Sequence, residues 1–200
     1  MISLANRRKL TTEKLILKNM LCHCCGRLIE HELKPMGVQV KSRHLGEIDI
    51  TYDHGKLNRT DILKRLKDAG FLVVNSKEKQ LLEQVKAAIT DLVHHTTYNA
   101  MVRNSDYLVE RFAVSYQYIS SLFPKYENTT LEKYIILHKI EKVKELLQQD
   151  ELSLSEIAFM MGYSSVQYLS TQFKQITGVS VSEFKNDPGR YRQPLDELGA

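Results

Sequence analysis

Three cysteines with the spacing of a soft-metal site lie near the start of the chain, in the segment "MLCHCC". Cys22 and Cys25 are three residues apart, and the surrounding pattern predicts a loop between a strand and a helix. Two thiolates in such a loop can bind one ion, and sulfur ligands favour Cu(I), Zn and similar soft metals. A helix that begins directly after the thiols also favours the thiolate form. We therefore expect a metal site at Cys22 and Cys25, with His23 and Cys24 as further candidate ligands.

Other interpretations of these cysteines remain open. A free cysteine often packs as a small hydrophobic residue, and a C-x-x-C pair in the cytosol can be redox-active. The motif could also be a relic in a domain that now serves only for association. A structural disulfide framework is not expected, because three cysteines so close together cannot join distant parts of a fold.

A second group of candidate residues comes from an internal repeat. The segment "SYQYISSLF" (115–123) returns fifty residues later as "SVQYLSTQF" (165–173). At 100° per residue, Ile119, Leu122 and Phe123 share one face of the first helix, and small polar residues lie opposite. Such a face can enter the major groove of DNA, because Gln can bind adenine with two hydrogen bonds and Ser or Thr can bond to several base edges. The predicted DNA-binding residues are Gln117, Ser120, Ser121, Lys125, Gln167, Ser170, Thr171 and Lys174.

Each copy of the repeat includes a preceding short helix, which makes the unit a helix-turn-helix. In the second copy, Ser153 and Glu156 predict a capping box, and Gly162 predicts the end of the first helix. A linking helix from about residue 130 to 149 would span on the order of 30 Å, close to the roughly 34 Å between successive major-groove segments. We expect two DNA-reading helices on a stiff connection, although such helix pairs also occur as plain packing units.

The remaining pattern predicts an α+β protein. Residues 1–75 read as β-α-β-β-α-β, the order of a ferredoxin-like domain, with strands at "KLILKNM", "VQVKSRHL", "EIDITYD" and "FLVV" and helices at "CCGRLIEHELKPMG" and "NRTDILKRLKDAG". Residues 76–186 read as an all-helical domain with two helix-turn-helix units. The tail 187–200 is rich in turn-forming residues and is expected to be loose.

Composition excludes several classes of protein. No window approaches eighteen apolar residues, and the start of the chain lacks the apolar run of a secretory signal, so we expect a cytoplasmic protein without a membrane span. Ser/His/Asp spacings, Gly-rich phosphate loops and paired carboxylates do not stand out, so an enzyme is not expected.

The net charge of +4 is unevenly distributed. Residues 1–75 carry 14 Lys and Arg against 8 Asp and Glu, a net charge of +6, and residues 76–200 carry 14 against 16, a net charge of −2. DNA-binding domains are usually basic, so the helical domain alone is expected to bind weakly. Further cations that could line one side of it are Lys139, Lys185, Arg190 and Arg192.

Residues 78–186 resemble the DNA-binding domain of the AraC/XylS family of bacterial transcription regulators. The matching segments are "SYQYISSLF", "KIEKVKELL", "LSLSEIAFMMGYSSVQYLSTQFKQITG" and "SEFK". The resemblance implies seven helices, double-stranded DNA as partner, and recognition positions within the predicted residues above. RNA polymerase and a second copy of the chain are further expected partners. The chain departs from the family pattern at Val181, Val143 and Asn128, and Asn128 is expected to adopt the left-handed conformation of the family's glycine.

The first 75 residues resemble the heavy-metal-associated domain of copper chaperones and metal-transporting ATPases. "MLCHCC" fits that family's M-x-C-x-x-C, which implies a buried Met20 and metal ligands at Cys22 and Cys25. Asn19 replaces the usual glycine, and Cys24 is additional. The complete interpretation is an AraC-type regulator that requires no cofactor and responds to a soft metal ion. The alternative is a metal-trafficking or thiol redox-switch protein whose helical domain binds a protein partner.

Overall fold

The computed structural model describes residues 9–96, 103–187 and 193–198. The chain divides into two compact units, residues 1–87 (unit 1) and 88–200 (unit 2). The division falls inside helix α3 (Lys77–His94), about ten residues after the border predicted near Asn75. The first turns of α3 pack on unit 1, where Gln84 Nε2 donates to Glu47 Oε2 at 3.0 Å.

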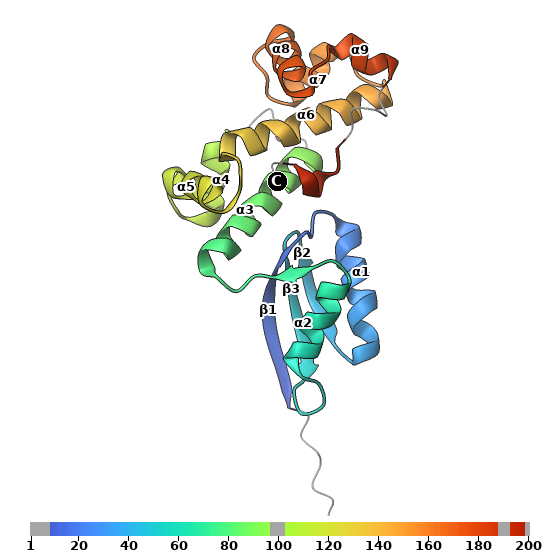
Figure 1. Cartoon of the computed structure of the whole chain (residues 1–200), viewed down its shortest axis with the longest axis vertical. Coiled ribbons are helices and arrows are strands. Elements are labelled where there is room, and N and C mark those ends of the chain that lie inside the picture. Colours follow the sequence, from blue (N-terminus) through green and yellow to red (C-terminus); the bar gives the residue numbers. More distant parts are fainter. Residues whose placement is uncertain (1–8, 97–102, 188–192, 199–200) are drawn as a thin grey trace, which may run out of the picture. The chain divides into compact units, whose positions relative to one another are not determined.

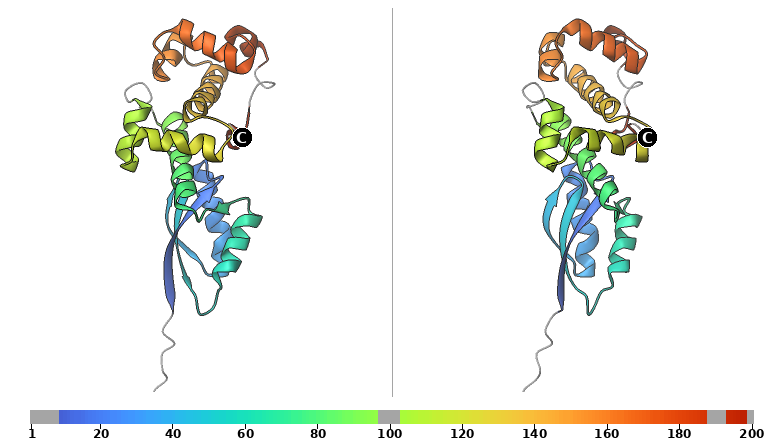
Figure 2. Two further views of the ribbon diagram at one scale, coloured as in Figure 1. Left: turned by 60° about the vertical axis from the view of Figure 1, so that its left-hand side comes forward. Right: turned by 90° about the vertical axis from the view of Figure 1, so that its left-hand side faces the viewer.

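Unit 1 contains a four-stranded antiparallel sheet with two helices on one face (Figures 1 and 2). The strand order is β2-β3-β1-β4. The element order β-α-β-β-α-β is the one that the sequence predicted. In chain order the elements are β1 (Leu10–Lys18), α1 (His23–Leu33), the short 3₁₀ helix η1 (Lys34–Met36), β2 (Gln39–His44), β3 (Glu47–Asp53), α2 (Arg59–Asp68) and β4 (Leu72–Val73).

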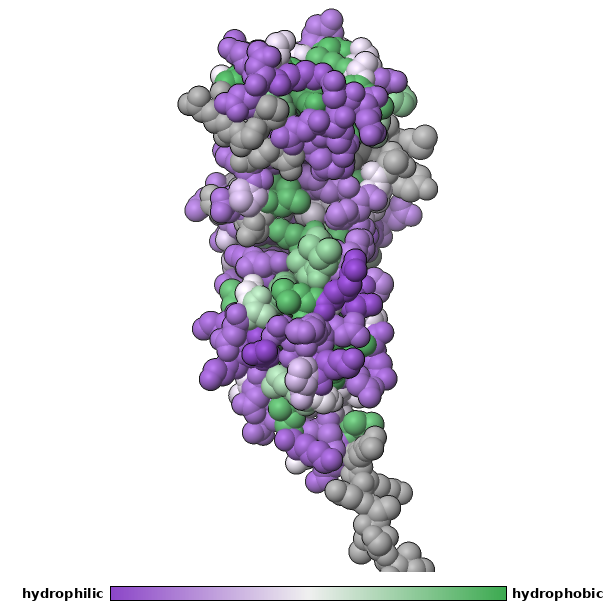
Figure 3. Space-filling model, turned by 90° about the vertical axis from the view of Figure 1, so that its right-hand side faces the viewer, coloured by the Kyte–Doolittle hydropathy of each residue, from purple (hydrophilic) through white to green (hydrophobic). Residues whose placement is uncertain are grey.

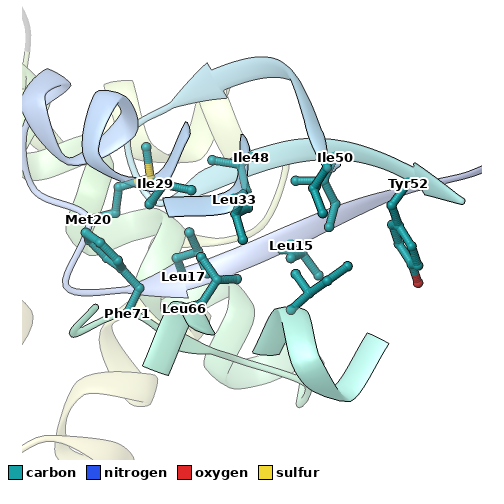
Figure 4. Close-up of a cluster of buried hydrophobic side chains, with 12 residues drawn as sticks. Leu15, Leu17, Met20, Ile29, Leu33, Ile48, Ile50, Tyr52, Leu66 and Phe71 are labelled. Atoms are coloured by element: carbon teal, nitrogen blue, oxygen red, sulfur yellow. The ribbon is translucent and has the colours of Figure 1, made fainter. Parts of the chain in front are cut away.

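The core of unit 1 lies between the sheet and its two helices (Figure 4). Alternate residues of the strands point toward the helices, because side chains of a strand alternate between its two faces. From the helices, Ile29 and Leu33 of α1 and Ile62 and Leu66 of α2 complete the cluster. Met20 lies at the same end of the cluster as Phe71 and is buried, as the sequence predicted. The loop that carries the cysteines is therefore anchored to the core by Met20.

Unit 2 is built around the long helix α6 (Leu131–Gln149). Helix α5 (Tyr116–Tyr126) packs on α6, and α4 (Asn104–Phe112) packs on α5. Figure 1 shows this pair at one end of α6. Helices α7 (Leu154–Met160), α8 (Val166–Thr177) and α9 (Val181–Asn186) pack against α6 as a second group. The last turn of α3 also contacts α6, where His94 Nε2 and the buried His138 Nδ1 are 3.2 Å apart.

Serine and threonine caps fix where these helices begin. The side chain of the N-cap accepts a hydrogen bond from the third backbone N–H of the helix at Ser115, Thr130, Ser153, Ser165 and Ser180. The predicted capping box of Ser153 with Glu156 is present. A second capping box, Ser180 with Glu183, was not predicted.

Left-handed residues end several helices of unit 2. Gly162 (φ 70°) follows α7, as expected for a glycine at this position. The corresponding turn after α4 uses Ala113 (φ 53°), and α6 ends at Asp150 (φ 53°). The expectation of a left-handed Asn128 was wrong, because among the described non-glycine residues positive φ occurs only at Asn19, Ala113 and Asp150.

The described part of the C-terminal tail is packed and not loose. Residues Leu195–Glu197 form a 3₁₀ helix, Leu198 is buried, and the backbone N–H of Gln193 donates to Glu141 Oε2 at 3.3 Å. Arg190 and Arg192, two of the expected cations, lie outside the described residues. Within the described ranges, no helix has the length and apolar character needed to cross a membrane.

Candidate nucleic-acid interface and thiol site

Helix α5 separates its apolar and polar residues in the way that the repeat predicted. Ile119, Leu122 and Phe123 are buried, whereas Gln117 and Ser121 are exposed. Ser120 is half-buried and Lys125 is exposed. The exposed polar face begins directly after the Ser115 cap, whose Oγ accepts from the Tyr118 backbone N–H at 3.2 Å.

Helix α8 repeats this arrangement at most of the aligned positions. Leu169 and Phe173 are buried, and Ser170 is half-buried like Ser120. The remaining predicted residues of α8 are exposed, and these are Gln167, Thr171 and Lys174. The Ser165 cap accepts from the Tyr168 backbone N–H at 3.1 Å. The two helices therefore present the same sequence of cap, glutamine and hydroxyl residues to solvent.

Hydrogen bonds within each helix determine what the exposed hydroxyl groups can offer to a ligand. Ser121 Oγ donates to the Tyr118 carbonyl at 2.7 Å, and Thr171 Oγ1 donates to the Gln167 carbonyl at 2.8 Å. Because each hydroxyl proton is used within its own helix, the oxygen is left as an acceptor. An acceptor at these positions suits the amino groups of adenine and cytosine, which point into the major groove.

Two exposed tyrosines were not singled out from the sequence, although the repeat aligns them. Tyr118 and Tyr168 occupy equivalent positions in α5 and α8, with exposed fractions of 41% and 54%. The most exposed large apolar side chain of the described residues is Phe159 of α7, at 72%. On the face shown in Figure 3, polar side chains predominate and apolar side chains occur in scattered patches. Scattered exposed apolar residues are common on protein surfaces, so the repetition of the two tyrosines is the more informative feature.

Lys139 does not line a basic surface, contrary to expectation. Its Nζ donates to the Met161 carbonyl at 2.9 Å and lies 5.7 Å from the centre of the Tyr163 ring. Burial lowers the pKa of Lys139, and burial also raises the pKa of Tyr163. Tyr163 OH in turn donates to Gln172 Oε1 at 2.6 Å. These contacts hold the turn between α7 and α8 against α6, so Lys139 positions the second pair of helices.

The two helix pairs, α4 with α5 and α7 with α8, thus share a left-handed turn, a serine cap and a buried apolar face. Residues 108–187 match a family model described as a helix-turn-helix domain. Unit 2 carries a helix-turn-helix domain. The predicted helix-turn-helix character of the chain is confirmed for this part.

The helix-turn-helix domain is similar to parts of bacterial regulators. The Msm operon regulatory protein of Streptococcus mutans is 29% identical over 113 residues, which are 56% of this chain and 38% of that protein. The Xylose operon regulatory protein of Haemophilus influenzae is 31% identical over 78 residues, which are 39% of this chain and 20% of that protein. The chain therefore spans well under half of the length of these relatives.

Among solved structures, part of this chain is similar to the C-terminal domain of AraT, a response regulator from Geobacillus stearothermophilus. It is 25% identical, with a TM-score of 0.47, over 56% of this chain and 88% of that chain. The family match and the regulator relatives support the AraC/XylS resemblance for the C-terminal part. The prediction that the chain is not an enzyme agrees with these relatives, which are regulatory proteins.

The thiol site of unit 1 consists of two neighbouring sulfur atoms at the start of α1. Cys22 is the N-cap of α1, and its Sγ lies 3.1 Å from Cys25 Sγ. Both residues are half-buried, whereas Cys24 is exposed. The loop begins with a tight turn at Asn19 (φ 70°), whose Nδ2 donates to the Gly70 carbonyl at 3.3 Å. Asparagine tolerates this left-handed conformation, in which a glycine is usual.

The two thiols differ in acidity. Burial acts to raise the pKa of Cys22, but hydrogen bonds with Cys25 and Cys24 outweigh it and lower the pKa below its ordinary value. The pKa of Cys25 is raised by burial and by its hydrogen bond to Cys22. Cys22 therefore loses its proton first, and the Cys25 thiol donates to the resulting thiolate.

The sulfur pair has a suitable separation to bind one soft ion. Two sulfurs that each lie about 2.3 Å from an ion are at most about 4.6 Å apart, and 3.1 Å is within this limit. A closed zinc site needs four ligands, yet among the described residues no three His, Cys, Asp or Glu side chains gather at one point. The predicted further ligands His23 and Cys24 therefore do not join the pair, and a soft ion with few ligands, such as Cu(I), fits it better.

Proposed function

We propose that this protein is a sequence-specific, DNA-binding transcription regulator of AraC type, in which α5 and α8 enter the major groove. The observation that carries the proposal is the identical arrangement of the two helices, each with a serine cap, a buried apolar face and an exposed glutamine. In helix-turn-helix proteins the N-terminal residues of the second helix contact base edges. Gln117 and Gln167 lie at this position in their helices.

Each exposed side chain has a role that follows from its chemistry. Gln117 and Gln167 would bind adenine with two hydrogen bonds, and the hydroxyl oxygens of Ser121 and Thr171 would accept from base amino groups. The half-buried Ser120 and Ser170 would contact the edge of the same base pairs. Lys125 and Lys174, farther along each helix, would bind phosphates. Double-stranded DNA is the proposed partner, and RNA polymerase and a second copy of the chain are further proposed partners.

Helix α6 supports simultaneous reading by α5 and α8. Its 19 residues span about 28 Å at about 1.5 Å per residue, which is close to one turn of DNA. The two helices would then contact successive segments of the major groove on one side of the duplex.

We further propose that unit 1 is a ferredoxin-like, heavy-metal-associated type of domain that binds a soft metal ion at Cys22 and Cys25. The strand order, the buried Met20 and the 3.1 Å sulfur pair support this proposal. Helix α3 could transmit the presence of the ion, because it bonds to Glu47 of unit 1 and to His138 of unit 2. Such coupling requires that the two states of the protein differ in their affinity for DNA.

A thiol redox switch is the second candidate function, and the short distance between the two sulfurs favours it. Oxidation would join Cys22 and Cys25 in a disulfide and release two protons and two electrons to the oxidant. The two candidates differ in their effector. If the switch is redox-based, mild oxidant changes the affinity for DNA and Cu(I) under reducing conditions does not.

The test of DNA reading uses duplexes selected by the wild-type protein from a random-sequence pool. One bidentate contact contributes about 1–3 kcal/mol to base discrimination, so Gln167→Ala should weaken binding to the selected duplex by roughly 5- to 150-fold. Binding to random duplex should change little. The matched control is Gln149→Ala, at an exposed glutamine at the end of α6. Equal effects of both substitutions, or no selected sequence at all, would contradict the proposal.

A further inference from the structure

Part of the positive charge of the helix-turn-helix domain is not available for the phosphates of DNA. Three of its lysines are held by other groups of unit 2 and are half-buried or buried: Lys139 by the Met161 carbonyl, Lys142 by Glu145 and Lys144 by Glu141. The reading helices themselves contribute one exposed lysine each, Lys125 and Lys174. Other exposed cations of the described part of this domain are Arg103, Arg111, Lys133 and Lys185. Since phosphate contacts supply most of the affinity that does not depend on sequence, exposed cations of unit 1 would add to the affinity of this domain for DNA.

Unit 1 contains a groove between α1 and β2 whose charged lining is entirely basic. The groove has a volume of about 240 Å³ and is lined by Met20, Cys22, His23, Gly26, Arg27, Arg43, His44 and Leu45. None of these lining residues is acidic. All four basic residues of this lining, His23, Arg27, Arg43 and His44, are exposed. We call this feature the α1–β2 groove.

The position of Arg43 in the α1–β2 groove is fixed by two neighbours on α1. Its aliphatic stem lies over Gly26, where an added Cβ would be only 3.2 Å from Arg43 Cδ. Its Nη1 donates to Glu30 Oε2 at 2.5 Å. A guanidinium has five N–H donors in a planar fork that matches a phosphate, so the bond to Glu30 holds the group in place and leaves other donors. Arg27 of α1 also lines the groove and adds a second guanidinium.

We infer that the α1–β2 groove binds the phosphodiester backbone of DNA and adds electrostatic affinity to that of the helix-turn-helix domain. The inference rests on the proposed DNA-binding function. Exposed guanidinium groups suit a continuous polyanion, because arginine contacts to phosphate position a protein on DNA without reading its sequence. The excess positive charge of residues 1–75, +6 against −2 for the remainder, has the sign that this role requires.

The test compares two double variants of the full chain that remove equal charge from unit 1. Arg27→Ala/Arg43→Ala removes two cations from the groove, and the control Lys64→Ala/Lys67→Ala removes two exposed cations from α2. Affinity for a random-sequence duplex is measured by fluorescence anisotropy between about 50 and 200 mM salt, where each phosphate contact contributes about 0.9 to the slope of log affinity against log salt. The magnitude of this slope should decrease by about 1–2 in the groove variant. The control should keep the wild-type slope.

Several outcomes would overturn the inference. An unchanged slope in the groove variant, or an equal decrease in the control, would show that the groove makes no specific phosphate contact. If wild type does not bind duplex at low salt, the proposed function itself fails, whereas wild-type binding with an unchanged variant slope contradicts only the groove. Perturbation of the groove's NMR signals by inorganic phosphate, with an unchanged slope, would indicate a small-anion site.

Loss of folding in the double variant can be separated from loss of contact. The single variant Arg27→Ala changes an exposed side chain and should lower the slope by about 1. Arg43→Lys keeps the charge and can still pair with Glu30, so it should retain most of the wild-type slope. Circular dichroism of each variant verifies that the secondary structure is preserved.

Discussion

Removal of the Phe173 ring from α8 tests whether the reading helix is held in place by the core of unit 2. Phe173 has no exposed surface, and its ring packs edge-on against that of Phe184 in α9, with centroids 5.5 Å apart. Replacing a buried Phe by Ala costs about 3–5 kcal/mol, part of which is the aromatic pair, itself about 0.5–1.5 kcal/mol. We expect Phe173→Ala to lower the free energy of unfolding by about 3–4 kcal/mol.

The matched control is another phenylalanine of the same helix-turn-helix unit. Phe159 of α7 is 72% exposed, so Phe159→Ala should change the free energy of unfolding by no more than about 0.5 kcal/mol. Phe173→Leu retains most of the buried volume and should cost less than about 1.5 kcal/mol. Urea denaturation followed by far-UV circular dichroism measures all three values.

Hydrogen exchange shows where the loss of stability acts. The amides of α8 should exchange faster in Phe173→Ala, because this side chain packs α8 against Phe184 of α9. The reasoning is wrong if Phe173→Ala costs no more than Phe159→Ala, or if the protection of α8 does not change. Either result would mean that the packing between α8 and α9 does not position the reading helix.

Three further predictions concern the caps and the thiols. The pKa values of Glu156 and Glu183 lie below the ordinary value of 4.5 because their serine caps bond to the carboxylates. The stabilising contribution of these carboxylates is therefore present above about pH 4.5 and lost as the pH falls further. Melting curves at decreasing pH can verify this loss. Ser165→Ala should lower the free energy of unfolding by about 0.5–2 kcal/mol, measured by urea denaturation, and no change would exclude the cap. Cys22→Ser should abolish binding of Cu(I), measured by competition with a chelator, whereas Cys24→Ser should retain it.

The sequence predicted the features that depend on local period and spacing. The order β-α-β-β-α-β follows from runs of alternating and helical hydrophobic residues, and each of these elements is present in unit 1. The buried and exposed faces of α5 and α8 follow from 100° per residue, which needs no tertiary information. The Ser153 capping box was also visible, and the Ser180 box has the same S-x-x-E signature and could have been found in the same way.

The features that the sequence did not predict depend on contacts between distant residues. Lys139 was expected at the surface because lysine usually is exposed, but a carbonyl 22 residues away accepts its hydrogen bond. The end of unit 1 lies inside α3 because Gln84 bonds to Glu47, and no change in composition marks that position. The tail was expected to be loose from its turn-forming residues, and the single buried Leu198 gives no periodic signal.

The two turns that precede α5 and α8 differ in backbone strain. The turn after α7 places glycine in the left-handed region, whereas the turn after α4 places Ala113 there at φ 53°. An alanine in this conformation costs roughly 1 kcal/mol, so the two copies of the repeat differ in the backbone strain of their turns. In the proposed function, the first helix pair would therefore open more readily than the second.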